Sequence, residues 1–304
     1  MSNIKKQANF KCGYIGIIGR PNVGKSTLVN LFVNHKVSIT SNRPQTTRHR
    51  ILGIKTTEQS QFVFVDTPGV HFDRKLALNK IMNKTALAVI SDVDVILFML
   101  DRLEWGKIEQ SILEEINKVS IPVVLVVNKI DHLKNKSRLL PYIQSLSEKF
   151  KFKEIVPISA KTGESVDSLE KIILDCLPES MPFFPEEQVT DKTERFVVAE
   201  IIREKLMRTL GQELPYSLTV EIDSFKTKNE ILHISAVIWV ERKGQKIIVI
   251  GKGGQQLKNI GQLARVELEK YFDQKVFLQL WVKIKQGWTN NERALRSLGY
   301  QDES

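Results

Sequence analysis

The first half of the chain alternates short, almost wholly apolar runs with stretches in which apolar residues recur every three to four positions. Apolar runs of this kind are typical of parallel strands that are covered on both faces. The pattern predicts strands over 14–19, 61–66, 94–100, 121–128 and 154–159, and helices over 25–34, 75–91, 107–119, 136–150 and 165–176. With an additional edge strand over 48–58, this order predicts an α/β domain with a doubly wound, mostly parallel sheet.

The pattern changes at LPESMPFFPEEQVTD, residues 177–191, which fits neither helical nor strand periodicity. A different order follows, with a helix, two strands, a short helix, a long helix and a last strand. These elements are expected over 193–209, 217–225, 231–241, the run before residue 251, 255–272 and 275–284. The order predicts a small α+β domain. The expected organisation is a first domain over 1–180, a linker over 181–192 and a second domain with a C-terminal tail over 193–304.

Charge narrows the range of partners. The 304 residues include 45 Lys and Arg against 35 Asp and Glu, a formal net charge of +10. Such a balance favours nucleic acid or an acidic membrane surface, although a basic surface without such a partner is the simpler alternative. Cys12 and Cys176 form neither a disulfide framework nor a metal motif, which favours a reducing compartment.

Membrane and export signals do not emerge from the pattern. No apolar run approaches the roughly 18 residues that a membrane span needs. The start of the chain, MSNIKKQANF, has no apolar signal core behind its basic residues. The expected location is therefore the cytoplasm, with peripheral contact to a membrane at most.

A glycine-rich loop, GRPNVGKS at residues 19–26, fits the G-x-x-x-x-G-K-S spacing between a predicted strand and a predicted helix. Its glycines let the backbone N–H groups point at phosphate oxygens, and the start of the helix adds its positive end. Lys25 would reach the β and γ phosphates of a nucleoside triphosphate, and Ser26 would bind Mg²⁺. The predicted phosphate-binding residues are Gly19, Arg20, Pro21, Asn22, Val23, Gly24, Lys25, Ser26 and Thr27.

The motif NKID, residues 128–131, follows a predicted strand on the same sheet edge as the phosphate loop. Asp131 would accept hydrogen bonds from N1–H and N2–H₂ of guanine, which adenine does not offer. Hydrogen bonds to a charged group contribute about 1.5–3 kcal/mol each, so this position favours guanine. In SAK, residues 159–161, the N–H of Ala160 would contact the guanine carbonyl. The predicted base-binding residues are Asn128, Lys129, Ile130, Asp131, Ser159 and Ala160.

Two further short motifs would complete the triphosphate site. In DTPG, residues 66–69, Asp66 would hold Mg²⁺ through water and the N–H of Gly69 would meet the γ-phosphate. In QTTRHR, residues 45–50, Thr47 or its neighbour Thr46 would complete the Mg²⁺ shell. Arg48, His49 and Arg50 are interpreted as a solvated switch segment, with an arginine finger or RNA contacts as alternatives. The residues predicted at the DTPG turn are Asp66, Thr67, Pro68, Gly69 and Val70.

These motifs occur in the order found in P-loop GTPases, and the chain resembles the translation-factor class of that family. QTTRHR, DTPGVH and the second domain make it similar to the Era family in particular, from about Cys12 to Tyr300. The resemblance implies binding of GTP and GDP with Mg²⁺, and hydrolysis of GTP. Slow turnover is expected without a partner.

The motifs lack the residue that commonly positions the attacking water. Ras-like switches place a water-orienting glutamine after their DTxG motif, where this chain has Val70. Related GTPases with an asparagine in the phosphate loop use it to hold K⁺, and Asn22 matches that position. The residues assigned to catalysis are Lys25, Thr47, Asn22 and Gly69. The alternative is that Asn22 only shapes the loop.

A second glycine loop, GKGG at residues 251–254, lies between two predicted helices. It lacks the G-K-[ST] ending and follows a helix rather than a strand, which argues against a second nucleotide site. G-x-x-G between helices is the signature of a KH domain, and the element order is similar to the type II arrangement found in Era. In such domains the loop clamps a nucleic-acid backbone beside an apolar groove. From Arg242 to Val266 there are 6 basic residues and no acidic ones.

The predicted RNA contacts extend from this loop into the C-terminal tail. Ile248, Ile250, Leu257 and Ile260 would line or support the groove, or simply pack in the core. Trp288 in the tail would offer a surface for base stacking, with packing on the domain as the alternative. The predicted RNA-binding residues are Arg242, Lys243, Lys246, Gly251, Lys252, Gly253, Gly254, Lys258, Lys283, Lys285 and Trp288.

The predicted function is a GTP-controlled switch that binds RNA. The Era resemblance implies single-stranded RNA near the 3′ end of small-subunit ribosomal RNA, and a role in maturation of the small subunit. The alternative is a GTPase that signals in cell-cycle control at an anionic membrane surface. A GTPase of tRNA modification is a third possibility, although no cysteine-bearing or folate-type module is visible.

Overall fold

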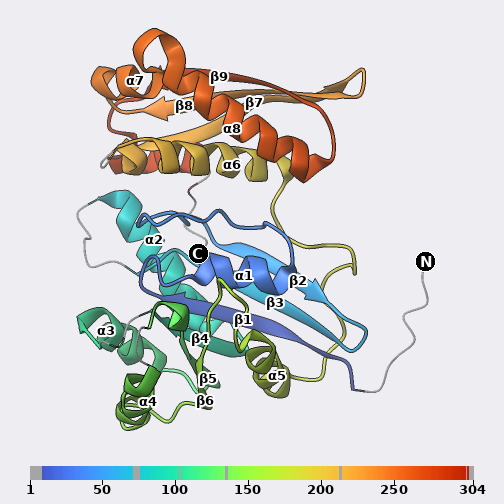
Figure 1. Ribbon diagram of the computed structural model, residues 1–304, viewed down its shortest axis with the longest axis vertical. Coiled ribbons are helices and arrows are strands. Elements are labelled where there is room, and N and C mark those ends of the chain that lie inside the picture. Colours follow the sequence, from blue (N-terminus) through green and yellow to red (C-terminus); the bar gives the residue numbers. More distant parts are fainter. Residues whose placement is uncertain are drawn as a thin grey trace. The chain divides into compact units, whose positions relative to one another are not determined.

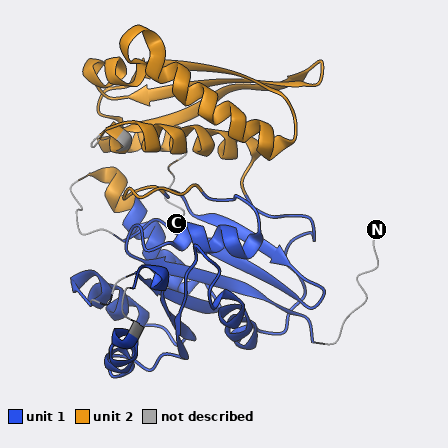
Figure 2. Cartoon of the chain, viewed as in Figure 1, with its two compact units in different colours: residues 1–38, 47–72, 82–191 blue, residues 39–46, 73–81, 192–304 orange. Residues whose placement is uncertain are grey.

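The computed structural model describes residues 9–70, 76–101, 103, 105–133, 136–211, 214–298 and 300. They form two compact units, shown in Figure 2. Unit 1 contains the described parts of 1–38, 47–72 and 82–191, and unit 2 contains those of 39–46, 73–81 and 192–304. The last change from unit 1 to unit 2 falls between Asp191 and Lys192. The membership of segments 39–46 and 73–81 in unit 2 is a finding that no pattern in the sequence predicts.

Unit 1 is built on a six-stranded sheet with the strand order β2-β3-β1-β4-β5-β6. All neighbouring pairs are parallel except β2 and β3, so the expected doubly wound, mostly parallel sheet with an additional edge strand is confirmed, and the structure shows that this edge strand is antiparallel. The central strands are buried along nearly their whole length, which explains their unbroken apolar sequence. The strands are β1 (Lys11–Gly19), β2 (Ile51–Thr56), β3 (Ser60–Asp66), β4 (Val95–Leu100), β5 (Val123–Val127) and β6 (Glu154–Pro157).

Helices cover both faces of this sheet (Figure 1). Side chains of α1 and α5 share one hydrophobic core with the sheet, and those of α2, α3 and α4 share another on the opposite face. The α-helices are α1 (Lys25–Val33), α2 (Ala77–Ala88), α3 (Lys107–Ile116), α4 (Leu139–Ser147) and α5 (Val166–Cys176). Short 3-10 turns are η1 (Val89–Ser91), η2 (Ile130–His132) and η3 (Lys136–Arg138).

The proline-rich stretch that was predicted as a linker is bound along unit 1. Ile54 donates its N–H to the carbonyl of Val189 at 2.9 Å, and Leu52 donates to the carboxylate of Asp191 at 2.9 Å. Gln61, buried in β3, accepts from the N–H groups of Phe183 and Phe184. Prolines and acidic residues excluded a helix or strand here, but they did not exclude these hydrogen bonds to the edge strand β2 and its neighbour.

Unit 2 has a three-stranded sheet with the order β7-β8-β9, in which β7 and β8 are antiparallel and β8 and β9 are parallel. The predicted α-β-β-α-α-β order is confirmed. The strands are β7 (Leu218–Lys228), β8 (Ile231–Val240) and β9 (Val276–Ile284). The helices are α6 (Glu194–Thr209), η4 (Leu214–Ser217), α7 (Lys243–Ile250), η5 (Lys252–Gly254), α8 (Gln255–Phe272), η6 (Trp288–Asn290) and α9 (Glu292–Ser297). Within the described ranges, no helix has the length and apolar character to cross a membrane.

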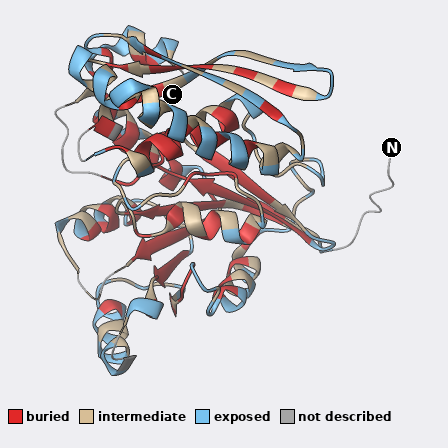
Figure 3. Cartoon of the chain, turned by 45° about the horizontal axis from the view of Figure 1, so that its top comes forward, coloured by how far each residue is buried: buried red, intermediate tan, exposed pale blue. Residues whose placement is uncertain are grey.

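The sheet of unit 2 buries only one of its faces under α6 and α8 (Figure 1). Along β8, buried residues such as Ile234 and Ile238 alternate with more exposed ones such as His233 and Trp239, and only Val237 interrupts the alternation. Figure 3 shows buried, intermediate and exposed stretches along the β7–β8 hairpin. This alternation has the period of two that a half-buried strand requires. The sheet therefore presents a second face that α6 and α8 do not cover.

Helix α6 carries buried charges that bind the segment 39–46 of the same unit. The guanidinium of Arg203, 1% exposed, forms an ion pair with Glu200 and donates to the backbone carbonyl of Thr46. Glu204, fully buried, accepts from the N–H of Thr40 at 3.0 Å. Hydrogen bonds to charged groups contribute about 1.5–3 kcal/mol each, so the bonds from Arg203 to Thr46 and from Thr40 to Glu204 hold the segment on α6.

Candidate nucleotide and nucleic-acid sites

The phosphate loop joins the end of β1 to the start of α1, as its spacing predicts. Gly24 has a φ of 108°, and a Cβ atom there would lie 2.3 Å from the side-chain amide nitrogen of Asn128. A Cβ atom on Gly69 would lie 2.5 Å from the Cα atom of Pro21. Both glycines are therefore required by close neighbours. The structure brings the phosphate loop together with the NKID and DTPG motifs.

Lys25 lies across the phosphate loop and is 6% exposed. Its ammonium group donates to the carbonyl of Arg20 at 2.9 Å and to that of Gly19 at 3.3 Å. Burial lowers the pKa of Lys25 from 10.5 to about 8, and the nearby carboxylates of Asp66 and Asp101 partly oppose this shift. A phosphate beside the ammonium would favour its charged form. The side chain thus fits the predicted role of contacting a polyphosphate.

Three oxygen-bearing side chains meet next to this loop. Ser26 Oγ donates to Asp66 Oδ2 at 2.7 Å and lies 2.8 Å from Thr47 Oγ1. Asp66 is fully buried; burial raises its pKa, and the Ser26 hydroxyl opposes that rise. Within the described part of the chain, Asp66 Oδ1 has no hydrogen-bond partner. Mg²⁺ prefers oxygen ligands, so this cluster fits the predicted metal.

Thr47, rather than Thr46, belongs to this cluster. The hydroxyl of Thr46 lies 2.6 Å from that of Ser41 and donates to the carbonyl of Arg43 at 2.7 Å. The sequence left the two threonines open, and the geometry separates them. The next residue, Arg48, is 2% exposed, so the interpretation of 48–50 as a wholly solvated segment is wrong for Arg48.

The NKID and SAK loops are linked to the phosphate loop through Asn128. Its side-chain amide donates to the carbonyl of Val23 at 2.7 Å, and its carbonyl oxygen accepts from the N–H of Ala160 at 2.8 Å. Lys129 donates to the carbonyl of Asn22 at 2.6 Å and to the carboxylate of Asp101 at 2.8 Å. Because the N–H of Ala160 is engaged by Asn128, its predicted contact with guanine would have to share that proton.

Asp131 presents its carboxylate at the open end of the same loop. Its Oδ1 accepts from the hydroxyl of Ser159 at 2.8 Å, and this hydrogen bond holds the pKa of Asp131 below its usual value. Its Oδ2 lies 3.3 Å from Nε2 of the exposed His132. An ionised, oriented and exposed carboxylate fits the predicted recognition of two guanine N–H donors.

The other predicted nucleotide contacts are placed around this frame. Thr67 donates its hydroxyl to the carbonyl of Ile17 at 2.8 Å, so that side chain supports the sheet. Val70 is 8% exposed and donates its N–H to the carbonyl of Gly19 at 3.3 Å, which confines an apolar side chain next to the phosphate loop. Pro68, Thr27 and Ile130 belong to the described residues of this region. Residues 71–75, which follow the DTPG turn, lie outside the described residues.

Two supporting residues were missed by the sequence reasoning. Asp101 follows β4 and binds Lys129, and Glu109 in α3 forms an ion pair with Arg20 of the phosphate loop. Asp101 carried a usable signal, because it directly follows a buried strand on the sheet edge where the motifs lie. Glu109 carried none, since one acidic residue on an amphipathic helix has no distinguishing pattern.

The second glycine loop is open to solvent. Lys252 and Gly253 are exposed, and a Cβ atom on Gly253 or Gly254 would meet no atom within 4 Å. Both glycines have positive φ values, 59° and 79°. Their role is thus conformational, and a polymer can approach the loop directly. In α7, just before the loop, Ile247 and Ile248 are exposed, whereas the predicted groove residue Ile260 is fully buried in the core.

The predicted basic contacts surround the loop in sequence and are accessible. None of these lysines and arginines is buried, in contrast to Lys205 of α6. Lys283 and Lys285 belong to β9 and the residues after it, and both ammonium groups lie over the ring of Trp239, at 5.9 and 5.7 Å. The accessible set is Arg242, Lys243, Lys246, Lys252, Lys258, Lys283 and Lys285.

The prediction that Trp288 offers a surface for base stacking is wrong. Its side chain is fully buried, its indole N–H donates to the carbonyl of Ser217 at 3.2 Å, and its ring lies 5.9 Å from that of Tyr300. A nucleobase could stack on Trp288 only by displacing protein atoms. The interleaved basic and aromatic residues of the tail suggested a stacking surface, but the apolar ring is used to attach the tail to unit 2.

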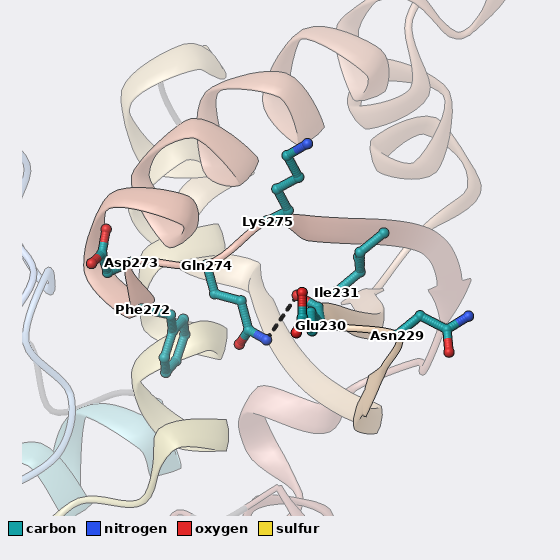
Figure 4. Close-up of a pocket in the computed structure, with 7 residues that line it drawn as sticks. All are labelled: Asn229, Glu230, Ile231, Phe272, Asp273, Gln274 and Lys275. Atoms are coloured by element: carbon teal, nitrogen blue, oxygen red, sulfur yellow. Dashed lines mark hydrogen bonds between the residues drawn. The ribbon is translucent and has the colours of Figure 1, made fainter.

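One pocket of unit 2 lies away from the predicted site residues. A solvent-open pocket of about 650 Å³ lies at the β7–β8 turn and the end of α8 (Figure 4). Gln274 crosses it and donates to the carbonyl of Glu230 at 3.0 Å. None of the predicted site residues lines it. The lining residues are Asn229, Glu230, Ile231, Phe272, Asp273, Gln274 and Lys275.

Comparison with known families gives two matches that together span both units. Residues 14–129 match the family described as 50S ribosome-binding GTPase, and residues 213–289 match the KH domain family. Both correspond to parts of the chain in which the structure places a glycine loop. The expected combination of a P-loop GTPase domain and a KH domain is confirmed.

Characterised relatives match nearly the whole chain. It is 54% identical over 295 residues to GTPase Era of Pseudomonas aeruginosa, covering 97% of both chains. It is 54% identical over 293 residues to GTPase Era of Haemophilus influenzae, covering 96% of this chain and 97% of the relative.

Solved structures agree with these relatives. A tyrosine variant of Aquifex aeolicus Era bound to GDP·AlF4⁻ matches with a TM-score of 0.93 and 41% identity, covering 96% of this chain and 99% of that one. Era in complex with MgGDPNP and nucleotides 1506–1542 of 16S ribosomal RNA matches with the same TM-score, identity and coverage. The identity exceeds what a shared fold alone would give, and it extends over both glycine loops. The chain belongs to the Era family of GTPases.

Proposed function

We propose that this protein is a GTP-hydrolysing switch that binds small-subunit ribosomal RNA near its 3′ end and acts in assembly of the small ribosomal subunit. The observation that carries the proposal is the presence, in one chain, of an assembled Ser26–Thr47–Asp66 cluster beside a phosphate loop and of an open GKGG loop. A relative with 41% identity binds MgGDPNP and 16S ribosomal RNA nucleotides 1506–1542. The proposed division assigns residues 1–180 to GTP, 181–192 to the connection and 193–304 to RNA.

In the proposed GTP site, the phosphates are bound by backbone N–H groups of the phosphate loop, other than at Pro21, which has none, and Lys25 neutralises the charge that develops on them. Ser26 and Thr47 would hold Mg²⁺ directly, and Asp66 would hold it through water. The metal, when bound, supplies electrostatic stabilisation of the β and γ phosphates. The N–H of Gly69 orients the γ-phosphate, and Asp131 selects guanine with Ser159 as its support.

We infer that hydrolysis uses K⁺ beside the phosphates, since a valine at position 70 cannot orient a water molecule. Asn22 has a φ of 64°, and its carbonyl is fixed by Lys129. Its side chain and the backbone of 38–47 would position the cation where other GTPases place an arginine finger. Turnover is expected to be slow without a partner that completes the site.

The link between GTP and RNA is proposed to run through residues 38–50 and 66–80. Thr46 and Thr47 are adjacent, but Thr46 is bound by Arg203 of unit 2 and Thr47 contacts Ser26 of unit 1. A change in Mg²⁺ coordination at Thr47 therefore acts on a peptide whose other side is attached to α6. Differential contacts of this kind are what a nucleotide switch requires.

The proposal is tested by capturing cellular RNA on the full-length protein in its GTP-bound and GDP-bound forms, by crosslinking and sequencing. Enrichment of the 3′ region of small-subunit RNA in one nucleotide state is expected. Binding to acidic vesicles without RNA enrichment would support the membrane-surface GTPase instead. The expected cytoplasmic location, with peripheral contact to anionic membrane as an addition, is tested by fractionation of cells in the same experiment.

A further inference from the structure

The uncovered face of the β7-β8-β9 sheet has an unusual composition. On strand β9, the side chains of Phe277 and Trp281 are 48% and 58% exposed. Large apolar side chains that gather on one exposed face mark an interaction site. In the register of the sheet, Phe277 lies beside His233, and the two rings are 5.1 Å apart. Trp239 lies on the same face of β8, beside Lys283. We call this surface the outer sheet face.

Basic side chains accompany these rings. His233 pairs with Lys226 of β7, and Lys228 follows two residues later on the same side of the strand. At the other end of the face, Lys283 and Lys285 lie over Trp239. The acidic residues of β7 are Glu221, which accepts from the indole N–H of Trp239, and Asp223. Four lysines against two carboxylates leave the outer sheet face positively charged.

A shallow pocket of about 200 Å³ lies between these strands. It places a flat ring next to ammonium groups and to hydrogen-bonding side chains of the same face. The lining residues are Ser224, Lys226, Lys228, His233, Ile234, Ser235, Phe277 and Gln279. Rings for stacking, cations for phosphates and short polar groups for base edges are the features that single-stranded nucleic-acid platforms combine.

The outer sheet face continues from the GKGG loop. Strand β9 is an edge strand of the sheet, and α7, which leads into the loop, packs against it. The exposed Ile247 and Ile248 of α7 and the exposed Trp281 of β9 therefore belong to two elements that pack against each other. A protein partner would be expected to meet a more apolar and less uniformly basic surface.

We propose that the outer sheet face is a second binding site for the same single-stranded RNA, on which unpaired bases stack against Trp281 and Phe277 and phosphates contact Lys226, Lys228 and Lys283. This inference rests on the proposed RNA-binding function and extends it. The GKGG loop grips the backbone at one point, and the outer sheet face binds a further stretch of the strand. Such a platform would also replace Trp288, whose buried ring is not accessible to a base.

The test compares RNA affinities of full-length variants by fluorescence anisotropy, with nucleotides 1506–1542 of 16S ribosomal RNA as the probe. Phe277→Ala with Trp281→Ala is expected to weaken binding about tenfold or more, because each base loses its stacking surface. Lys226→Glu with Lys228→Glu is expected to weaken binding and to reduce the salt dependence by about two released counterions. The matched controls are Leu140→Ala, an exposed apolar residue of unit 1, and Lys270→Glu, an exposed charge on α8.

Thermal unfolding of each variant identifies any that fail to fold, and ultraviolet crosslinking of the wild-type complex provides a second readout. Crosslinks are expected on peptides that contain Phe277 or Trp281. Unchanged affinity of the aromatic variant together with crosslinks confined to the GKGG loop would overturn the inference. Unchanged RNA affinity with lost binding to purified small subunits would also overturn it, in favour of a protein partner.

A variant of the loop, Lys252→Asp with Gly253→Asp, separates this inference from the proposed function. If the loop variant loses RNA affinity and the outer-face variants keep theirs, only the inference about the outer sheet face fails. If the loop variant keeps its affinity and the outer-face variants lose theirs, the loop assignment fails and the inference stands. If every variant binds RNA as the wild type does, both are rejected.

Discussion

The two glycine loops of this chain, residues 19–26 and 251–254, have opposite surroundings. In the first loop, Gly24 is confined by Asn128, and Lys25 is buried. In the second, Gly253 has empty space around the position of a Cβ atom, and Lys252 is exposed. The first loop suits a small ligand of fixed shape that must be enclosed for chemistry. The second suits a flexible polymer that must enter and leave from the side.

The difference teaches why glycine is needed in each case. A positive φ disfavours side chains at both Gly24 and Gly253, at a cost of roughly 1–2 kcal/mol for other residues. Only at Gly24 does a side chain also collide with a residue of the binding site. Substitutions of equal size should therefore affect the two loops very unequally.

The largest expected effect is that of Gly24→Ala. The added methyl would displace Asn128, which connects the phosphate loop to the base-recognition loops, so GTP affinity should fall by about three powers of ten or more. Isothermal titration with GDP and GTP measures this. Gly163→Ala is the matched control, because Gly163 has a φ of 84° and no atom within 4 Å of an added Cβ. Equal losses of GTP affinity in the two variants would show that the backbone conformation of Gly24, and not a collision of the added methyl with Asn128, explains the effect.

The second expected effect concerns the open loop. Lys252→Asp with Gly253→Asp replaces a cation by two anions where an RNA phosphate would lie, so RNA affinity should fall by about two powers of ten. GTP affinity and thermal stability should not change, because both residues are exposed. Filter binding with the 1506–1542 RNA provides the measurement. Retained RNA affinity would contradict the assignment of the second loop.

The third expected effect concerns the nucleotide specificity of the first loop's site. Asp131→Asn exchanges an acceptor for a donor at the guanine edge, so GTP affinity should fall by about one to two powers of ten and xanthosine triphosphate should become preferred. Competition between the two nucleotides measures the reversal. The neighbouring exposed His132→Asn serves as a control for local charge. An unaltered preference for GTP would reject Asp131 as the base reader.

The smallest expected effect is that of the monovalent cation. GTP turnover in KCl should exceed turnover in NaCl by about tenfold or less at equal ionic strength, because one positioned charge replaces an arginine finger. Asn22→Ala should lose this difference while it still binds GDP. Identical rates of the wild type in the two salts would remove K⁺ from the proposal.

Much of this architecture could be predicted from the sequence. The unbroken apolar runs of β3, β4 and β5 predicted a covered parallel sheet, and the motifs at their ends follow from its topology. The structure also brings together Ser26, Thr47 and Asp66, which the motifs predict as one metal site, although 40 positions separate Ser26 from Asp66. These successes depend on local spacing, since each motif reports its own position relative to a strand.

Features that depend on tertiary packing escaped prediction. Asn128 was assigned to the base, yet its side chain joins two loops, which no spacing encodes. Trp288 was taken for a stacking surface, because an aromatic residue among lysines looks the same whether its ring is exposed or buried. The hydrogen bond from Arg203 to the carbonyl of Thr46 joins residues 157 positions apart; Thr46 lies in the QTTRHR motif, but that motif gives no sign of a contact with a distant helix.

The contacts between α6 and residues 39–46 have a consequence for dissection of the molecule. A polypeptide that begins at Lys192 would contain every strand of the KH sheet, but it would lack the segment that covers Arg203 and Glu204. Water would reach two charged groups that the intact chain seals from solvent, and their ion pairs would lose most of their strength. The excised RNA-binding half should thus unfold at a lower temperature than the same unit with residues 39–46 in place. Supplying residues 39–46 as a separate peptide should restore part of that loss.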